Sequence, residues 1–264
     1  MDRPSETEKK MLKITLPFHA KKILQVMRLV RDGRKKSYEI LKKLEEIGWP
    51  PRMAQTYFSY CRHWGLILAK DCELTSLGKS IVRIDNAKLT DMASELVYYG
   101  CVSSKSFLTL GLLTQRLFKH LEKNGTFEFT VDEIPSHFLS EWKDRSGISD
   151  LVNVFHRVSI LKRERRGGKW VYLVDYHEPS LGSFSISLLN YVQNKQESGP
   201  PYNIKEFDEF KAYWFMSNES FIKFLTQCRA NGWISYQKYA DVNQFQFYIN
   251  DSAVLTEAVT KMKK

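Results

Sequence analysis

The segment Ala54–Ile67, AQTYFSYCRHWGLI, combines hydrogen-bonding side chains with helical spacing. Ala54, Phe58 and Cys61 are spaced by four and three residues, so a helix would place them on one face. Their neighbours would then face solvent, where Arg and Gln suit guanine and adenine edges, and Ser, Thr and Tyr suit phosphate oxygens. We predict that this helix spans 50–64. Its predicted contact residues are Arg52, Gln55, Thr56, Ser59, Tyr60 and Arg62.

Carboxylates are missing from this part of the chain, because no Asp or Glu occurs between Glu46 and Asp71. A carboxylate on the contact face would repel phosphate. Pro50 and Pro51 begin the predicted helix, where proline is well tolerated and free backbone N–H groups could meet a phosphate. The alternatives are an ordinary exposed polar helix face and a surface that contacts protein.

The positive charge of the chain is concentrated in its first third. The net charge is +10 over 264 residues, and residues 1–90 carry 19 Lys and Arg against 10 Asp and Glu, an excess of +9. A local basic surface favours a polyanion, most often nucleic acid, although Lys-rich faces are also simply solvated. The turn that precedes the predicted helix 37–48 adds three candidate phosphate contacts, Arg34, Lys35 and Lys36.

A second basic feature is the segment KRERRGGK at 162–169, which has five positive residues and one acid around Gly167 and Gly168. Two glycines between alternating strands predict a hairpin with a two-residue turn. Arginines at a hairpin tip suit the phosphate backbone and the narrow minor groove, but Lys and Arg also protect edge strands, and this alternative stays open. The candidate contacts here are Lys162, Arg163, Arg165, Arg166 and Lys169.

One order of elements occurs three times along the chain. A helix is followed by a shorter amphipathic helix, by a third helix that ends at an equivalent residue in each unit, and by a strand pair. The end point is Gly65 in the first unit and Gly232 in the last, while Ser159 takes this place in the middle unit, which an additional helix over 90–104 precedes. The first and second helices of the units are predicted at 20–33 and 37–48, at 106–125 and 130–142, and at 183–196 and 203–214.

This order of three helices and a hairpin resembles the winged helix-turn-helix superfamily. The Gly65 segment with the following ELTSLGK looks like the end of a recognition helix and the wing, and the segments around Ser159 and Gly232 resemble the same element. The resemblance implies a mainly α fold with small β-hairpins (α+β), arranged as tandem winged helix-turn-helix domains. We expect these domains at 1–89, 90–180 and 181–264. In such a unit, the recognition helix lies in the major groove of DNA.

Patterns for catalysis or metal binding are incomplete. LTSLGKS at 74–80 ends like a phosphate-binding loop, but Glu73 stands where the required glycine would be. Glu209 and Lys211 are expected to form a surface ion pair on a helix. Three possible metal ligands lack a fourth partner and a C-x-x-C pair: Cys61, His63 and Cys72. We therefore expect no enzymatic activity, no metal site and no cofactor.

The remaining composition favours a cytoplasmic protein. The chain contains no run of about 18 apolar residues, and its first ten residues are polar, so we expect neither a membrane span nor a secretory leader. Four cysteines in a chain of this length do not form a disulfide framework, which is typical of a reducing compartment.

The expected function is non-enzymatic binding of double-stranded DNA, in transcription regulation or as the DNA-binding subunit of a larger DNA-handling complex. The C-terminal unit is almost neutral and rich in aromatic residues, so we expect it to bind a protein partner or to form a homodimer. The alternative is a winged-helix interaction scaffold in a chromosome-organising, plasmid-maintenance or phage-defence complex. A role as an RNA-binding accessory factor is a third interpretation, but no signature of an RNA-binding module is visible.

Overall fold

The computed structural model places most of the chain. It describes residues 19–32, 36–68, 70, 72–104, 108–125, 128–134, 152, 153, 155, 156, 161–174, 178–194, 202–238, 244–249 and 252–261. Arg34 and Lys35, two of the predicted phosphate contacts, lie outside these residues, as does most of the predicted helix 130–142.

Four helices lie in the described residues of the N-terminal part. The bounds are α2 (Ala20–Arg31), α3 (Ser37–Glu46), α4 (Pro51–His63) and α5 (Ser76–Asn86). The first three agree with the predicted helices to within two residues at each end. The predicted strand pair after α4 is reduced to one antiparallel bridge between Ile67 and Leu74. Thr75 caps α5 by accepting a hydrogen bond from the Gly78 N–H at 3.1 Å, so this turn leads directly into α5.

Two helices end with the same backbone geometry, as the shared glycine position predicts. Gly65 after α4 has φ +65° and Gly232 after α11 (Asn218–Ala230) has φ +68°. In each case the following N–H donates to a carbonyl five residues earlier: Leu66 to Cys61 at 2.9 Å, and Trp233 to Cys228 at 3.0 Å. This is the hydrogen bond of a Schellman cap, which needs a residue in the left-handed region.

We expect Gly65→Ala to destabilise the fold by about 1–2 kcal/mol, because an L side chain is unfavourable in the left-handed region. No atom lies within 4 Å of the position of an added Cβ, so steric contact contributes nothing to this cost. Gly65→Asn is the control, since asparagine tolerates the left-handed region and should recover much of the loss. Midpoints of urea unfolding measure both, and equal midpoints for Ala and Asn would contradict this explanation.

The middle and C-terminal parts share one sheet topology, while most of the predicted third helix that ends at Ser159 lies outside the described residues. In the middle part, α7 (Leu108–Asn124), β1 (Glu128–Thr130) and a 3-10 turn η2 (Val131–Glu133) precede the hairpin of β2 (Leu161–Arg166) and β3 (Lys169–Val174). The strand order is β1-β3-β2, and all pairs are antiparallel. Thr130 and Glu133 form a capping box, in which the Thr130 N–H donates to the Glu133 carboxylate at 2.6 Å, and within the described residues it starts a 3-10 turn.

In the C-terminal part, α9 (Leu181–Asn194) is followed by β4 (Tyr202–Asn203), η4 (Ile204–Phe207), α10 (Asp208–Tyr213), α11, β5 (Ile234–Lys238) and β6 (Gln244–Ile249). The strand order β4-β6-β5 is again antiparallel throughout. The short first strand therefore joins the outer edge of a hairpin in both sheets. The prediction of a mainly α fold with small β-hairpins is confirmed.

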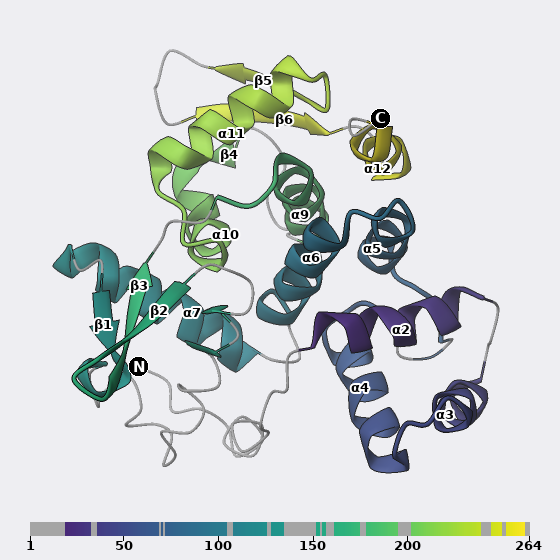
Figure 1. The fold of residues 1–264 in the computed structure, drawn as a ribbon. Coiled ribbons are helices and arrows are strands. Elements are labelled where there is room, and N and C mark those ends of the chain that lie inside the picture. The colour runs from purple at the N-terminus through teal and green to yellow at the C-terminus, as the bar shows by residue number, and fades with distance from the viewer. Residues whose placement is uncertain are drawn as a thin grey trace.

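A buried helix, α6 (Thr90–Val102), connects the parts. It packs against α2, α5, α7 and α9, and it is buried on almost all sides between Leu96 and Val102 (Figure 1). The sequence predicted this helix only as an addition to the middle unit. The buried apolar residues of the described chain form one continuous cluster, so the predicted boundary at 89/90 crosses a common core.

The last helix, α12 (Ser252–Lys261), returns to the first part of the chain. It packs against α5 and α9, and the hydroxyls of Ser80 and Thr256 form a buried hydrogen bond of 2.9 Å. None of the helices in the described ranges has the length and apolar character required to cross a membrane.

A candidate nucleic-acid interface

The predicted ridge of α4 is buried. Ala54, Phe58 and Cys61 all lie in the core, and this orientation turns Arg52 and Gln55 outward, where both are exposed. Neither of these two side chains has a hydrogen-bond or ion-pair partner among the described residues. No acidic residue occurs in the first turn of α4, and no side chain caps its N-terminus. The outward face therefore offers one amide and one guanidinium that are free to bind another molecule.

Two further predicted contacts on α4 are half-buried and make local bonds. The Thr56 hydroxyl donates to the Arg52 carbonyl at 2.7 Å, and the Ser59 hydroxyl lies 3.0 Å from Nδ1 of His63. Because the Thr56 hydrogen is used within the helix, this hydroxyl offers only its acceptor lone pairs to a partner. Thr56 is therefore a poor donor to phosphate.

Tyr60 was expected on the outward face, and this prediction is wrong. Its side chain is only 4% exposed, and its ring stacks on Trp64 with centroids 5.3 Å apart and an interplanar angle of 1°. Residue 60 follows Tyr57 by three positions, and both lie on an apolar stripe that is wider than the ridge of Ala54, Phe58 and Cys61.

Arg62 is only partly available. Its guanidinium carbon lies 4.9 Å from the centroid of the Phe58 ring, and Nη2 donates to Sγ of Cys72 at 3.2 Å. Its Nε is buried without a hydrogen-bond partner. The side chain therefore lies back against the turn that follows α4, and a ligand could reach only part of it.

The basic residues near α4 fall into two groups. Arg28 pairs with the buried carboxylate of Asp85, and Arg31 and Lys43 pair with acids on their own helices or turns: Asp32 for Arg31 at 2.7 Å and Glu46 for Lys43 at 3.0 Å. Lys36, Lys42 and Arg52 are exposed and have no ion pair with any described residue. The cations that remain uncompensated thus lie at the start of α3, on its outer face and at the start of α4.

The β2–β3 hairpin has two different faces, set by its register. Arg165 is opposite Trp170 and Arg163 is opposite Tyr172, so these four side chains share one face with the buried pair Leu161 and Val174. Tyr172 is buried, but Trp170 is 46% exposed, and the Arg163 guanidinium lies 4.5 Å from its ring centroid. This face therefore runs from the core into solvent as a row of arginines beside an indole.

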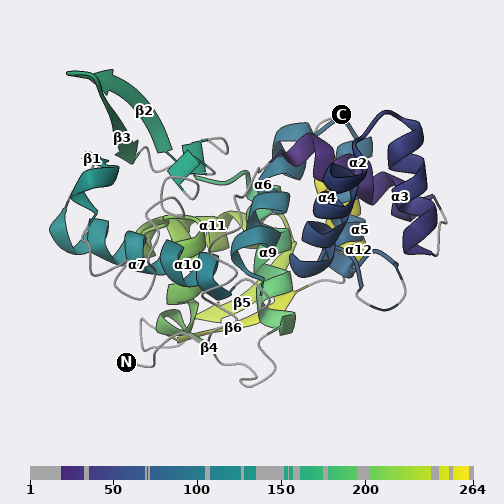
Figure 2. The ribbon, with the colours of Figure 1, turned by 90° about the horizontal axis from the view of Figure 1, so that it is seen from below.

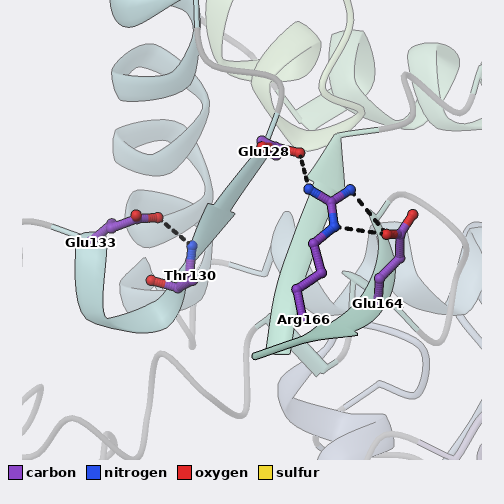
Figure 3. A network of polar contacts seen from close by, with 5 residues as sticks. All are labelled: Glu128, Thr130, Glu133, Glu164 and Arg166. Atoms are coloured by element: carbon purple, nitrogen blue, oxygen red, sulfur yellow. Dashed lines mark hydrogen bonds and ion pairs between the residues drawn. The ribbon is translucent and has the colours of Figure 1, made fainter. Parts of the chain in front are cut away.

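The other face of the hairpin is charge-compensated. Arg166 lies between Glu128 of β1 and Glu164 of β2, at 2.9 Å from each carboxylate (Figure 3). Lys169 is 3.6 Å from Asp132. The hydrogen bonds to Glu164 and Glu128 raise the pKa of Arg166 above its usual value. Of the basic residues predicted as contacts in this hairpin, Arg166 and Lys169 thus have acidic partners. Only Glu164 lies within the segment KRERRGGK, whereas Glu128 and Asp132 precede it by about 30 residues or more.

The two basic surfaces are far apart in the molecule. In both views the β2–β3 hairpin lies at the opposite end from α3 and α4, and in Figure 2 it projects beyond the helices around it. The structure therefore packs α3, which carries Lys42 and begins after Lys36, against α4, but it places the hairpin at the other end of the molecule.

The C-terminal part has no comparable basic face on its third helix. Lys223 of α11 pairs with Glu178 at 3.0 Å. Three aromatic residues that suited a protein interface, Tyr213, Trp214 and Phe215, are buried instead. Among the residues of this part whose side chains the structure describes, the aromatic surplus belongs to the core, and the expected partner or homodimer contact stays a prediction.

Glu209 and Lys211 do not form the expected surface ion pair. Lys211 is only 6% exposed and pairs with Asp208 at 2.6 Å. Glu209 instead accepts hydrogen bonds from the Tyr213 hydroxyl at 2.5 Å and from the Gln115 amide at 3.1 Å. Burial and the neighbouring Glu209 carboxylate raise the pKa of Tyr213 beyond its usual range. This arrangement stabilises the contact of α7 with α10, and it leaves the Lys211 ammonium covered.

A pocket of about 230 Å³ lies between α7, β1 and η2. Its rim includes two carboxylates, but Glu128 pairs with Arg166 and Glu133 accepts the Thr130 N–H at 2.6 Å. In the part of the chain that the structure describes, no three His, Cys, Asp or Glu side chains are arranged to hold a metal ion.

Comparison with family models, with curated proteins and with solved structures finds no match to this chain. The functional argument therefore rests on the residues and contacts above.

Proposed function

We propose that this chain is a non-enzymatic protein that binds double-stranded DNA, and that it is built from tandem winged helix-turn-helix units. In this proposal α4 is the recognition helix of the first unit and enters the major groove. The strand orders β1-β3-β2 and β4-β6-β5 support the winged-helix assignment of the other two units, and in the C-terminal unit α9, α10 and α11 also precede the β5–β6 hairpin. Transcription regulation or a subunit role in a DNA-handling complex would both use this interface.

The observation that carries the proposal is the charge pattern around α4. Arg52, Lys36 and Lys42 are exposed without acidic partners, while the helix itself has no carboxylate over its whole length. Buried or exposed basic residues in folded proteins commonly have acids nearby, as Arg28 and Arg31 do here. A cluster of uncompensated cations next to a helix is the electrostatic arrangement that phosphate binding requires.

Within this interface the side chains have different roles. Gln55 is the candidate for base readout, since its amide can bond the N6 and N7 edge of adenine. Arg52 can bond guanine or a phosphate, and Lys36 and Lys42 can neutralise phosphates beside the groove. Ser59, Thr56 and Arg62 are secondary candidates because of their local bonds, and Tyr60 is no longer among the candidates.

The salt dependence of binding tests the proposal. A labelled blunt duplex is titrated with the full chain at several salt concentrations between about 50 and 200 mM, and the logarithm of affinity is plotted against the logarithm of salt concentration. Three phosphate contacts correspond to a slope of about −2.7, at about −0.9 for each contact. Absent binding, or affinity that does not change with salt, would remove the proposal.

The second candidate is the interaction scaffold, and one observation favours it. Three large apolar side chains of the first unit are exposed, Tyr38 at 60%, Ile47 at 44% and Leu68 at 43%, and the first two lie in or next to α3. Exposed apolar side chains of this size suit a protein interface. Sedimentation of the chain at increasing concentration separates the candidates: self-association that Tyr38→Ser abolishes, together with no salt-dependent binding of DNA, would favour the scaffold.

A further inference from the structure

The hairpin β2–β3 carries an exposed tryptophan that the fold does not need. Along the face that begins at Leu161 and Val174, the core ends at Tyr172, which is buried and stacks on Phe129. Trp170 lies one cross-strand pair further out, where a polar residue would keep the hairpin equally paired. Four other tryptophans of the described chain are buried: Trp49, Trp64, Trp214 and Trp233.

The surroundings of Trp170 are selective for a ligand that is both flat and anionic. Arg163 lies over the indole at 4.5 Å, and Arg165 is its direct cross-strand neighbour. Neither arginine forms an ion pair with any described carboxylate, in contrast to Arg166 and Lys169 on the opposite face. Arg163 donates one hydrogen bond, from Nη1 to Oδ1 of Asn153 at 3.3 Å. Because the Arg163 guanidinium covers one side of the indole, a nucleobase would stack on the remaining exposed part of the ring, with its phosphates beside the two arginines.

We propose that this face of the β2–β3 hairpin, formed by Arg163, Arg165 and Trp170, is a stacking platform for an unpaired base of single-stranded DNA. The inference rests on the proposed function only in taking DNA as the nucleic acid. Bases within a duplex are stacked on each other, so an indole can stack on a base only at a single-stranded segment, an end or a junction.

The position of the hairpin would allow it to bind a single strand separately from the α4 surface. It projects from the end of the molecule opposite α3 and α4 (Figure 2), so a strand on Trp170 would not compete with a duplex on α4. Together the two surfaces would bind a duplex and an adjoining single strand. A junction between double- and single-stranded DNA is accordingly the form of DNA that this chain should prefer.

Binding of a labelled oligothymidine by the full chain tests the inference, with Trp170→Ala as the central variant. Base–aromatic stacking corresponds to a change of about 5- to 150-fold in affinity, so we expect a loss within this range. Trp170→Phe keeps an aromatic face and should recover most of the affinity. Tyr38→Ala is the matched control, since it removes an exposed aromatic ring beside a lysine at the other end of the molecule and should leave the affinity unchanged.

Tryptophan fluorescence gives a second readout that does not depend on affinity. Stacking of thymine on the indole should quench the emission of the wild-type chain, and Trp170→Phe should lose that quenching. An affinity of Trp170→Ala within twofold of the wild type, or equal quenching in both proteins, would overturn the inference.

The two proposals fail in different ways. Binding of blunt duplex without binding of oligothymidine would overturn the stacking platform and leave the proposed function in place. Binding of oligothymidine that depends on Trp170, without binding of blunt duplex, would overturn the proposed function and leave the stacking platform in place.

Discussion

Replacing Lys36, Lys42 and Arg52 together by alanine is expected to weaken binding of blunt duplex DNA by about 100-fold or more at 0.1 M salt. Each phosphate contact contributes about 0.9 to the gain in log affinity for each tenfold decrease in salt concentration. Three contacts therefore contribute about 2.7 logarithmic units of affinity when salt falls from about 1 M to 0.1 M, and the triple variant loses this contribution. All three side chains are exposed, so the substitutions leave the core unchanged. Fluorescence anisotropy at several salt concentrations measures both the affinity and the slope.

A second triple variant, Lys79→Ala with Arg83→Ala and Lys261→Ala, removes the same number of charges from α5 and α12. Arg83 and Lys261 both pair with Glu257, and the Lys261 side chain lowers the pKa of that carboxyl through a hydrogen bond. Charges outside the interface act only through screened long-range attraction, over a Debye length of about 10 Å at 0.1 M salt. We expect an effect below about threefold for this control. Equal losses in the two variants would mean that α3 and α4 have no special role.

The sequence predicted the direction of α4 correctly but not the availability of its side chains. Spacing by three and four residues is a local property, and it placed Ala54, Phe58 and Cys61 in the core and Gln55 outside. Tyr60 contacts Trp64 four residues further on, a helical spacing that belongs to a wider apolar stripe than the predicted ridge. The position of Arg62 depends instead on Cys72, which lies ten residues away beyond the turn at Gly65. Contacts of this kind have no period along the chain.

The same distinction applies to charge. The excess of basic residues in the first third could be counted from the sequence, but the ion pair of Arg28 with Asp85 joins residues 57 positions apart. The partner of Arg166 on β1 is likewise 38 positions away. Counting identified the basic regions, and only the tertiary structure shows which cations remain uncompensated.

At the level of the fold, local signals predicted helices and missed their assembly. The caps at Gly65 and Gly232 and the alternation of residues 161–174 are local, and the corresponding elements are present. The central position of α6 was not predictable. A helix that is apolar on nearly all sides does not indicate which of its faces packs against which other element. The contact of α12 with α5 joins Thr256 to Ser80 across 176 positions, which no pattern in either segment indicates.

The close approach of α5 to the turn after α4 gives the largest expected effect on stability. Gly78→Ala would place a Cβ only 2.2 Å from the Leu66 carbonyl oxygen. This oxygen already accepts the Thr75 N–H at 3.1 Å, so the backbone cannot move away without losing that hydrogen bond. Overpacking against backbone should cost about 3 kcal/mol, which corresponds to a fall in Tm of about 6–12 °C for a chain of this size.

Lys79→Ala is the control for Gly78→Ala, since the neighbouring position on α5 is exposed and alanine favours helix there. Its Tm should stay close to that of the wild type, and a Tm of Gly78→Ala within a degree or so of the same value would contradict the packing argument. The turn that Gly78 contacts also determines where α4 ends, because the Leu66 N–H caps this helix through the Cys61 carbonyl. Gly78→Ala should therefore weaken binding of duplex DNA at temperatures where the chain is still folded, whereas Lys79→Ala should not.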